Sequence, residues 1–166
     1  MEVKDYLIQL KECESKQEFK KIWDTNKFNW NNSYLLCENY SKYFKIWWNA
    51  EKFRWSLDSN ELCKYCSDYF EIWWDSGKFD WRNSNYLCKY CSDHFKIWWN
   101  PKKFDWKWSN YLTVYCSKYF SMWWNPEKFN LEKELTLFYL QKHCKNYKHI
   151  WKKDYIKWKL LNFKGG

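Results

Sequence analysis

Two Cys-x-x-Cys pairs are the residues whose types and spacing most directly suggest chemistry in this chain. Both pairs read Cys-Lys-Tyr-Cys, and residues 67–87 separate them. Four thiolates with similar spacing close a tetrahedral structural zinc site in zinc ribbons. A zinc site is therefore one interpretation of this group, which consists of Cys63, Cys66, Cys88 and Cys91.

Histidines are the other candidates for chemistry, and the chain has only three of them. Cys91 and His94 are spaced so that they could form a nucleophile and its base, but the sequence provides no third group to orient the histidine. The sequence also lacks the P-loop, the dinucleotide-binding turn and the His-Glu-x-x-His metal motif. We therefore expect no catalytic residue, no cofactor and no enzymatic activity.

A lysine precedes a phenylalanine at five positions that are 25 or 26 residues apart, and we call these five residues the ladder lysines: Lys27, Lys52, Lys78, Lys103 and Lys128. One interpretation is a row of cations that binds a polyanion or an acidic partner. The other is structural: each lysine covers a tryptophan ring with its stem, or pairs with an aspartate of the adjacent repeat. Both interpretations stay open, and the ladder lysines are the first group of candidate binding residues.

The ladder lysines belong to a longer repeat. The motif Lys-Phe-x-Trp occurs four times and ends with a fifth copy in which Leu131 replaces the tryptophan. A tryptophan stands ahead of each copy and a serine behind each of the first four, at nearly the same step. Such a period indicates a tandem-repeat protein. We expect a single domain over residues 1–166, with a partial repeat at 1–23, tandem repeats at 24–131 and a capping segment at 132–166.

The repeat also bears on the cysteines. Cys37 and Thr113 occupy the position of Cys63 and Cys88 in the other repeats, and Tyr40 and Cys116 occupy that of Cys66 and Cys91. A position that accepts Cys, Thr or Tyr is typical of packing, because a free cysteine packs as a small hydrophobe. We therefore favour packed thiols in a reducing compartment over zinc ligands.

The fold class follows from composition and spacing. Only 3 Gly and 2 Pro are present, which is few for an all-β protein with many tight turns. Apolar residues from Phe104 to Cys116 recur at intervals of three and four, as in a helix. The sequence predicts an all-α, solenoid-like tandem helical repeat of about five repeats of ~25 residues with degenerate ends.

Two breaks should divide each repeat into two short helices. Asn100 followed by Pro101 suits an N-cap and the first helical position, so we expect a helix to begin there. The second break is ambiguous between two sets of serines. It falls either at Ser67, Ser92 and Ser117, which would then cap the following helix, or near Ser84 and Ser109.

Aromatic residues make up 25% of the chain, and 16 of them are tryptophan. Adjacent helical residues point about 100° apart, so Trp98 and Trp99 cannot face the same way. One can fill the core of its repeat while the other fills the seam to a neighbour. Packing therefore explains most of the aromatic content, although some rings could line a ligand-binding groove.

The C-terminal segment carries most of the charge. From Gln141 to Gly166 there are eight lysines and one aspartate, which is +7 of the net +9. Apolar residues in the same segment recur every three or four positions, which predicts a basic amphipathic helix with room for one break. It could cap the repeats, lie on an anionic membrane, dock into a partner or touch nucleic acid. Its candidate binding residues, the C-terminal lysines, are Lys145, Lys148, Lys152, Lys153 and Lys157.

These observations predict a non-enzymatic repeat protein that binds another protein, as a scaffold or an inhibitor. The alternative is single-stranded nucleic acid or RNA, bound by the ladder lysines, aromatic rings and the basic C-terminal helix. A lesser alternative is peripheral membrane association through residues 141–166. We see no signal peptide and expect an intracellular, cytoplasmic protein. The bias to Asn, Lys and Tyr fits an AT-rich source such as a virus or a phage.

Overall fold

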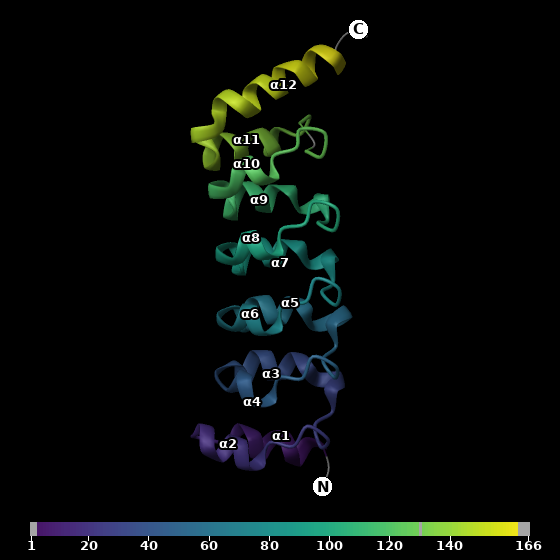
Figure 1. Cartoon of the computed structure of the whole chain (residues 1–166), viewed down its shortest axis with the longest axis vertical. Coiled ribbons are helices and arrows are strands. Elements are labelled where there is room, and N and C mark those ends of the chain that lie inside the picture. The colour runs from purple at the N-terminus through teal and green to yellow at the C-terminus, as the bar shows by residue number, and fades with distance from the viewer. Residues whose placement is uncertain (1–2, 130, 163–166) are drawn as a thin grey trace. The chain divides into compact units, whose positions relative to one another are not determined.

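The computed structural model describes residues 3–129 and 131–162, and within them it contains helices, turns and loops but no strand (Figure 1). The predicted all-α repeat is thus confirmed. The helices group into two compact units, Met1–Asp80 and Trp81–Gly166, which we call the N-terminal and C-terminal units and describe separately. The expected single domain over residues 1–166 stays a prediction.

Over residues 3–80, the N-terminal unit contains six α-helices: α1 (Val3–Lys11), α2 (Lys16–Ile22), α3 (Ser33–Tyr40), α4 (Phe44–Trp47), α5 (Trp55–Tyr65) and α6 (Phe70–Trp73). Short 3₁₀ turns precede several of them: η1 (Trp30–Asn32), η2 (Ser41–Tyr43) and η3 (Ser67–Tyr69). Each complete repeat has one long helix, α3 or α5, followed by one short helix, α4 or α6. The long helices α3 and α5 pack side by side.

The C-terminal unit continues the pattern with long helices α7 (Ser84–Tyr90), α9 (Ser109–Tyr115) and α11 (Glu134–His143). The short helices are α8 (Phe95–Trp98) and α10 (Phe120–Trp123), and α12 (Lys148–Asn162) closes the unit. The 3₁₀ turns are η4 (Trp81–Asn83), η5 (Ser92–His94), η6 (Trp106–Trp108), η7 (Ser117–Tyr119) and η8 (Lys145–Tyr147). Helix α9 packs against α7 on one side and α11 on the other (Figure 1).

Both positions that the sequence offers for the second break are real boundaries. Ser84 and Ser109 begin α7 and α9, whereas Ser67, Ser92 and Ser117 begin the 3₁₀ turns between long and short helices. The predicted capping role of this second set is wrong. Cys66 rather than Ser67 occupies the N-cap of η3, and no side chain caps that turn.

A buried tryptophan holds each of these breaks. In the C-terminal unit, the indole Nε1–H of Trp98 donates to the carbonyl oxygen of Cys91 at 2.8 Å, and this oxygen also accepts the backbone N–H of His94 at 3.1 Å. The same bond recurs in each repeat, with the indole seven residues after the carbonyl. Its other pairs are Trp47 with Tyr40, Trp73 with Cys66, Trp123 with Cys116 and Trp151 with Cys144. The bond satisfies a buried polar group and fixes the angle between the two helices.

The second tryptophan of each pair faces elsewhere, as the 100° rotation between neighbours predicts. The ring of Trp99 stacks on Phe95 with centroids 5.1 Å apart, and it meets Phe104 of the next repeat at 5.3 Å. A second aromatic pair joins the repeats, because Phe95 stacks on Tyr119 at 4.6 Å. The aromatic density of the sequence is therefore used largely for packing within and between repeats.

The serine at the start of the long helix is buried and also links consecutive repeats. The hydroxyl of Ser84 accepts the backbone N–H of Asp105 at 3.2 Å, and that of Ser33 accepts the backbone N–H of Arg54 at 3.4 Å. Each acceptor is 0% exposed. The periodic serine in the sequence is thus a polar contact between neighbouring repeats.

The helix expected to begin at Asn100 and Pro101 does not form. The Oδ1 atom of Asn100 caps a single turn by accepting the N–H of Lys102 at 3.0 Å, and the turn ends where Phe104 N–H donates to Asn100 O at 2.9 Å. The carbonyl of Pro101, which would continue a helix, instead accepts the indole N–H of Trp106 at 3.1 Å. Competition from this side chain ends the helix after one turn.

The 26-residue repeat shows how the fold absorbs an extra residue. The repeats of α3, α7 and α9 place a 3₁₀ turn before the long helix, but α5 runs unbroken from Trp55 through 11 residues. An α-helix has 3.6 residues per turn and a 3₁₀ helix has 3.0, so the added residue converts one into the other. Asp58 lies in the added turn, is buried and accepts the Ser33 hydroxyl at 2.5 Å.

We expect Trp98→Phe to lower the free energy of unfolding by about 2–4 kcal/mol, because it removes a buried hydrogen bond and leaves a void. Trp99→Phe is the matched control, since its ring is half-buried and its phenyl replacement keeps the stacking on Phe95. The control should cost clearly less. Urea unfolding followed by circular dichroism measures both changes, and equal losses would contradict the role of the indole–carbonyl bond.

Candidate functional site

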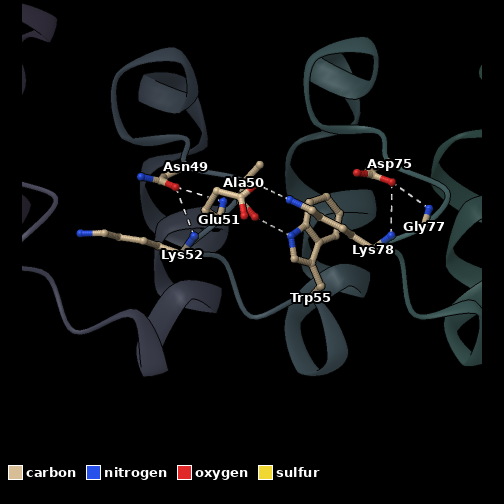
Figure 2. Close-up of polar contacts among 8 residues, drawn as sticks. All are labelled: Asn49, Ala50, Glu51, Lys52, Trp55, Asp75, Gly77 and Lys78. Atoms are coloured by element: carbon tan, nitrogen blue, oxygen red, sulfur yellow. Dashed lines mark hydrogen bonds and ion pairs between the residues drawn. The ribbon is translucent and has the colours of Figure 1, made fainter.

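The ladder lysines of the N-terminal unit contact their own protein. Lys52 Nζ donates to Asn26 Oδ1 at 2.8 Å and to the carbonyl of Thr25 at 3.3 Å, both in the turn of the preceding repeat. Figure 2 shows Lys78 reaching Glu51 in the same way, with Nζ and Oε1 2.5 Å apart. Lys27 lies 3.8 Å from the carboxylate of Asp24. These contacts hold the lysines against their own protein, but none of the three is to a tryptophan ring or to an aspartate of an adjacent repeat, so the structural interpretation in that form stays a prediction.

In the C-terminal unit, Lys103 and Lys128 have different surroundings. Lys103 Nζ lies 5.9 Å from the ring centroid of Trp81, which is a distant cation–π contact, and Lys128 is exposed. Each ladder lysine lies within the single turn that Asn or Asp caps, as Figure 2 shows for Lys52 and Lys78, so the five lysines hold equivalent positions of their repeats. Within each unit the structure therefore places them in a row, and binding by that row stays a prediction.

The 3₁₀ turn η8 and the first turns of α12 pack on the last repeat. Trp151 is buried and donates to Cys144 at 3.1 Å, and Tyr147 stacks on Phe120 with centroids 4.6 Å apart. Trp124 of the last tandem repeat donates its indole N–H to Asp154 at 2.8 Å. The C-terminal lysines, Lys145, Lys148, Lys152, Lys153 and Lys157, are all exposed. The sequence predicted a basic helix with room for one break in residues 141–166, and the structure has that break at η8, between α11 and α12. Residues 163–166 lie outside the described part.

The long helices of the C-terminal unit present a surface that the sequence analysis did not single out. Each of α7, α9 and α11 carries two aromatic rings four residues apart, so both rings of a helix lie on one face. The two rings of each pair lie with their centroids 5.8–6.1 Å apart, stacked in α7 and tilted in α9 and α11. We call these six residues the aromatic face: Tyr86, Tyr90, Tyr111, Tyr115, Tyr139 and His143.

The aromatic face is accessible to solvent. Tyr115 is 39% exposed and the other five rings are half-buried. Phe138 and Leu135 of α11 extend the surface, with 53% and 52% of their areas exposed. Between the rings of each helix, Leu87, Leu112 and Leu140 point inward and are 0% exposed. The helices thus bury one side in the repeat core and present a row of rings on the other.

Equivalent positions in the N-terminal unit have different chemistry. Helix α3 has Leu35 and Asn39 where α7 has its tyrosines, and α5 has Glu61 and Tyr65. The doubled aromatic positions are therefore confined to the long helices of the C-terminal unit. This difference within one repeated framework is the strongest indication that the face has a role besides packing.

Lysines lie beside the rings and are electrostatically linked to them. Lys89 Nζ is 4.9 Å from the ring centroid of Tyr90. The pKa of Lys89 is raised, first by a hydrogen bond to Tyr90 and also by Coulomb interactions with Tyr90, Tyr115 and Tyr111. Burial, and then the charge of Lys142, lower the pKa of His143, which favours the neutral imidazole. The face therefore combines aromatic rings with ammonium groups.

Sequence reasoning missed this surface because it grouped Tyr111 and Tyr115 with the core by their helical spacing. The available signal was the recurrence of tyrosine four residues apart in "SNYLCKY" and "SNYLTVY", around the buried leucine and Cys or Thr. Spacing alone does not separate a buried ring from a ring at the edge of the buried stripe. The exposure of such a ring depends on how closely the neighbouring helices pack against it.

The cysteines are thiols, and seven of the eight are buried. Burial, with a smaller contribution from Cys66, raises the pKa of Cys37, and burial raises that of Cys144 to about 12. Among residues 3–129 and 131–162, no group of three or more His, Cys, Asp or Glu side chains is placed to hold a metal ion. This does not support the zinc interpretation of Cys63, Cys66, Cys88 and Cys91.

A double-mutant cycle on Lys78 and Glu51 tests the ladder contacts. Because Glu51 is largely exposed, we expect a coupling free energy of about 0.2–1 kcal/mol that decreases as salt is added. The variants are Lys78→Met, Glu51→Gln and their combination, measured by urea unfolding. Zero coupling at low salt would show that the contact does not hold the lysine.

Thiol labelling tests the burial of the cysteines. At pH 8 we expect Cys13, which is partly exposed, to react with an aromatic disulfide reagent first, and the seven buried thiols to react only on unfolding. Burial keeps the reagent away from their sulfur atoms, and for Cys37, Cys88 and Cys144 it also raises the pKa, which keeps the thiolate fraction low at this pH. Cys13→Ser should remove the fast phase. Fast reaction of four further thiols, or a stoichiometric zinc content, would contradict this arrangement.

Because comparison with known proteins identifies no relative, a function for this chain has to be inferred from the repeat and the aromatic face. Within the described ranges, no helix has both the length and the hydrophobicity needed to traverse a bilayer. Searches against protein-family models, curated proteins and solved structures find no match to this chain.

Proposed function

We propose that this chain is a non-enzymatic helical-repeat protein that binds another protein through the aromatic face of its C-terminal unit. The observation that supports this most directly is the pair of half-exposed rings on each of three adjacent long helices. Bridging two proteins and blocking one protein are both compatible with such a surface. We propose a reducing, cytoplasmic setting, in keeping with eight cysteines that are present as thiols.

Tyrosine is well suited to a protein interface. Its ring offers a large amphipathic contact with only two side-chain torsions to immobilise, so ordering it on binding costs little entropy. Tyrosine is also enriched in the cores and hot spots of protein interfaces. Here the helices hold the rings and the stacked neighbours restrict them further. A preorganised surface loses less entropy when it meets a partner.

The size of the surface fits this role. A half-exposed aromatic side chain offers on the order of 80 Å². Because five of the six rings are mostly covered, the six rings together with Phe138 and Leu135 then offer at most on the order of 600 Å², compared with about 800 Å² per partner in a standard interface. Because the lysines around the rings carry positive charge, the expected partner presents apolar groups surrounded by carboxylates.

Single-stranded nucleic acid is the second candidate, because lysines accompany the aromatic rings. Lys107 Nζ lies 5.3 Å from the ring centroid of Trp108, and Lys142 Nζ lies 5.7 Å from that of Phe138. Rings and cations together are typical of single-strand binding. However, base stacking needs open ring faces, and here adjacent rings and lysine stems already cover part of them. We therefore place the protein partner first.

Replacing two tyrosines of the face tests the proposal. In affinity capture from the cells that produce this protein, we expect the intact chain to retain a defined protein in near-stoichiometric amount. Tyr90→Ser combined with Tyr115→Ser should reduce that recovery about tenfold or more, because truncated hot-spot residues cost at least about 1–2 kcal/mol each. Quantitative mass spectrometry measures the recovery.

The matched control is Tyr34→Ser combined with Tyr65→Ser, which removes two tyrosines from the long helices of the N-terminal unit. This control should retain the partner. Equal recovery by the two variants, or no retained protein, would contradict the proposal. Submicromolar, salt-sensitive binding of a labelled single-stranded 20-mer that needs Tyr90 and Tyr115 would instead support the nucleic-acid candidate.

A further inference from the structure

We propose that the outer face of α12 binds the surface of an anionic membrane. This inference rests on α12 and is independent of the protein partner proposed for the aromatic face. It starts from the way in which α12 is divided. One side of the helix packs on the last repeat, and the other side is exposed lysine and aliphatic side chain.

The packed side of α12 contains its aromatic residues and its only acid. Trp151 is 3% exposed, and Tyr155 and Trp158 are half-buried and stack on each other with centroids 6.2 Å apart. Asp154 accepts the indole N–H of Trp124 at 2.8 Å and is directed toward the repeat. The outer face of α12 therefore has no carboxylate of its own to offset its lysines, and the nearby carboxylate of Glu127 lines a pocket only with Lys157 among them.

The outer face combines cations with large aliphatic side chains. Ile156, Leu160 and Leu161 are 48%, 62% and 69% exposed. At 100° per residue, Ile156 and Leu160 form one stripe along the helix. Two exposed lysines lie on each side of that stripe: Lys152 and Lys159 on one side, Lys153 and Lys157 on the other.

An anionic bilayer complements both parts of this face. Lipid headgroups attract the lysines, and the aliphatic stripe between them can enter the boundary between headgroups and acyl chains. Long lysine stems let the ammonium groups remain at headgroup level while the stripe is buried. The phosphate backbone of a nucleic acid would match the lysines but leave Ile156 and Leu160 without an apolar partner. The membrane is therefore the occupant that uses the whole face.

Vesicle sedimentation of the full chain tests this binding. We expect the chain to sediment with phosphatidylcholine vesicles that contain about 30% phosphatidylserine, and to remain in solution with phosphatidylcholine alone. Raising the salt to about 0.5 M should weaken the binding, because it screens the lysines. Absence of sedimentation with the anionic vesicles would overturn the proposal.

Two variants separate the contributions of the face. Replacing Lys152, Lys153, Lys157 and Lys159 by Gln should reduce the partition coefficient about tenfold or more, and Ile156→Ser with Leu160→Ser should also reduce it. The matched control replaces four exposed lysines of the N-terminal unit by Gln, which changes the net charge equally: Lys11, Lys16, Lys20 and Lys45. Circular dichroism verifies that each variant is folded.

Each result decides the proposal. Loss in both α12 variants but not in the control supports it. An equal loss in the control would show that net charge alone drives binding, and an unchanged Ile156 and Leu160 variant would show that no side chain enters the bilayer; either result overturns the proposal. Preferential binding of a labelled single-stranded 20-mer through the same lysines would overturn it in favour of nucleic acid. The Tyr90 and Tyr115 variant should keep its vesicle binding, which separates this proposal from the proposed protein partner.

Discussion

The hydrogen bond from a buried indole to the carbonyl at the helix break is the interaction on which the rest of the repeat depends. Four residues, as in α8, are too few for a stable helix in isolation. The bond from Trp98 to Cys91 ties this helix back to the long helix that precedes it. Once that angle is fixed, Phe95 and Trp99 are positioned to meet the next repeat, and the longer helices can lie side by side.

Because the short helices and their tryptophans fix the geometry of each repeat, the outer side of the long helices can differ from repeat to repeat. In α3, α5, α7 and α9 the inner side is fixed by a leucine and its small neighbour, Cys or Thr, which are completely buried. The outer side can be Leu and Asn in α3 or two tyrosines in α7 without a change in the framework. The two surfaces proposed for binding are the aromatic face and the outer face of α12. Both consist of side chains that do not pack in the core, so packing does not restrict their residue types.

The fold class, the period and the C-terminal helix could be predicted because each depends on the spacing of motifs or of apolar residues along the chain. The helix expected after Asn100 could not, because the indole of Trp106 takes the carbonyl of Pro101. Capping by Ser67 failed for a related reason: the indole of Trp73 secures that break from seven residues beyond the carbonyl. Exposure of Tyr111 and Tyr115 depends on neighbouring helices, and no spacing rule contains that information.

The interchange of a 3₁₀ turn and an α-turn ahead of the long helix has a consequence for how such a gene can change. A codon gained or lost at this point alters the winding of a few residues, as at Trp55–Ser59, while the tryptophans and leucines on either side keep their places. This segment can therefore take up a change in length without moving the residues on either side of it. Repeats of unequal length can therefore coexist in one chain, and small insertions there need not disrupt the packing of their neighbours.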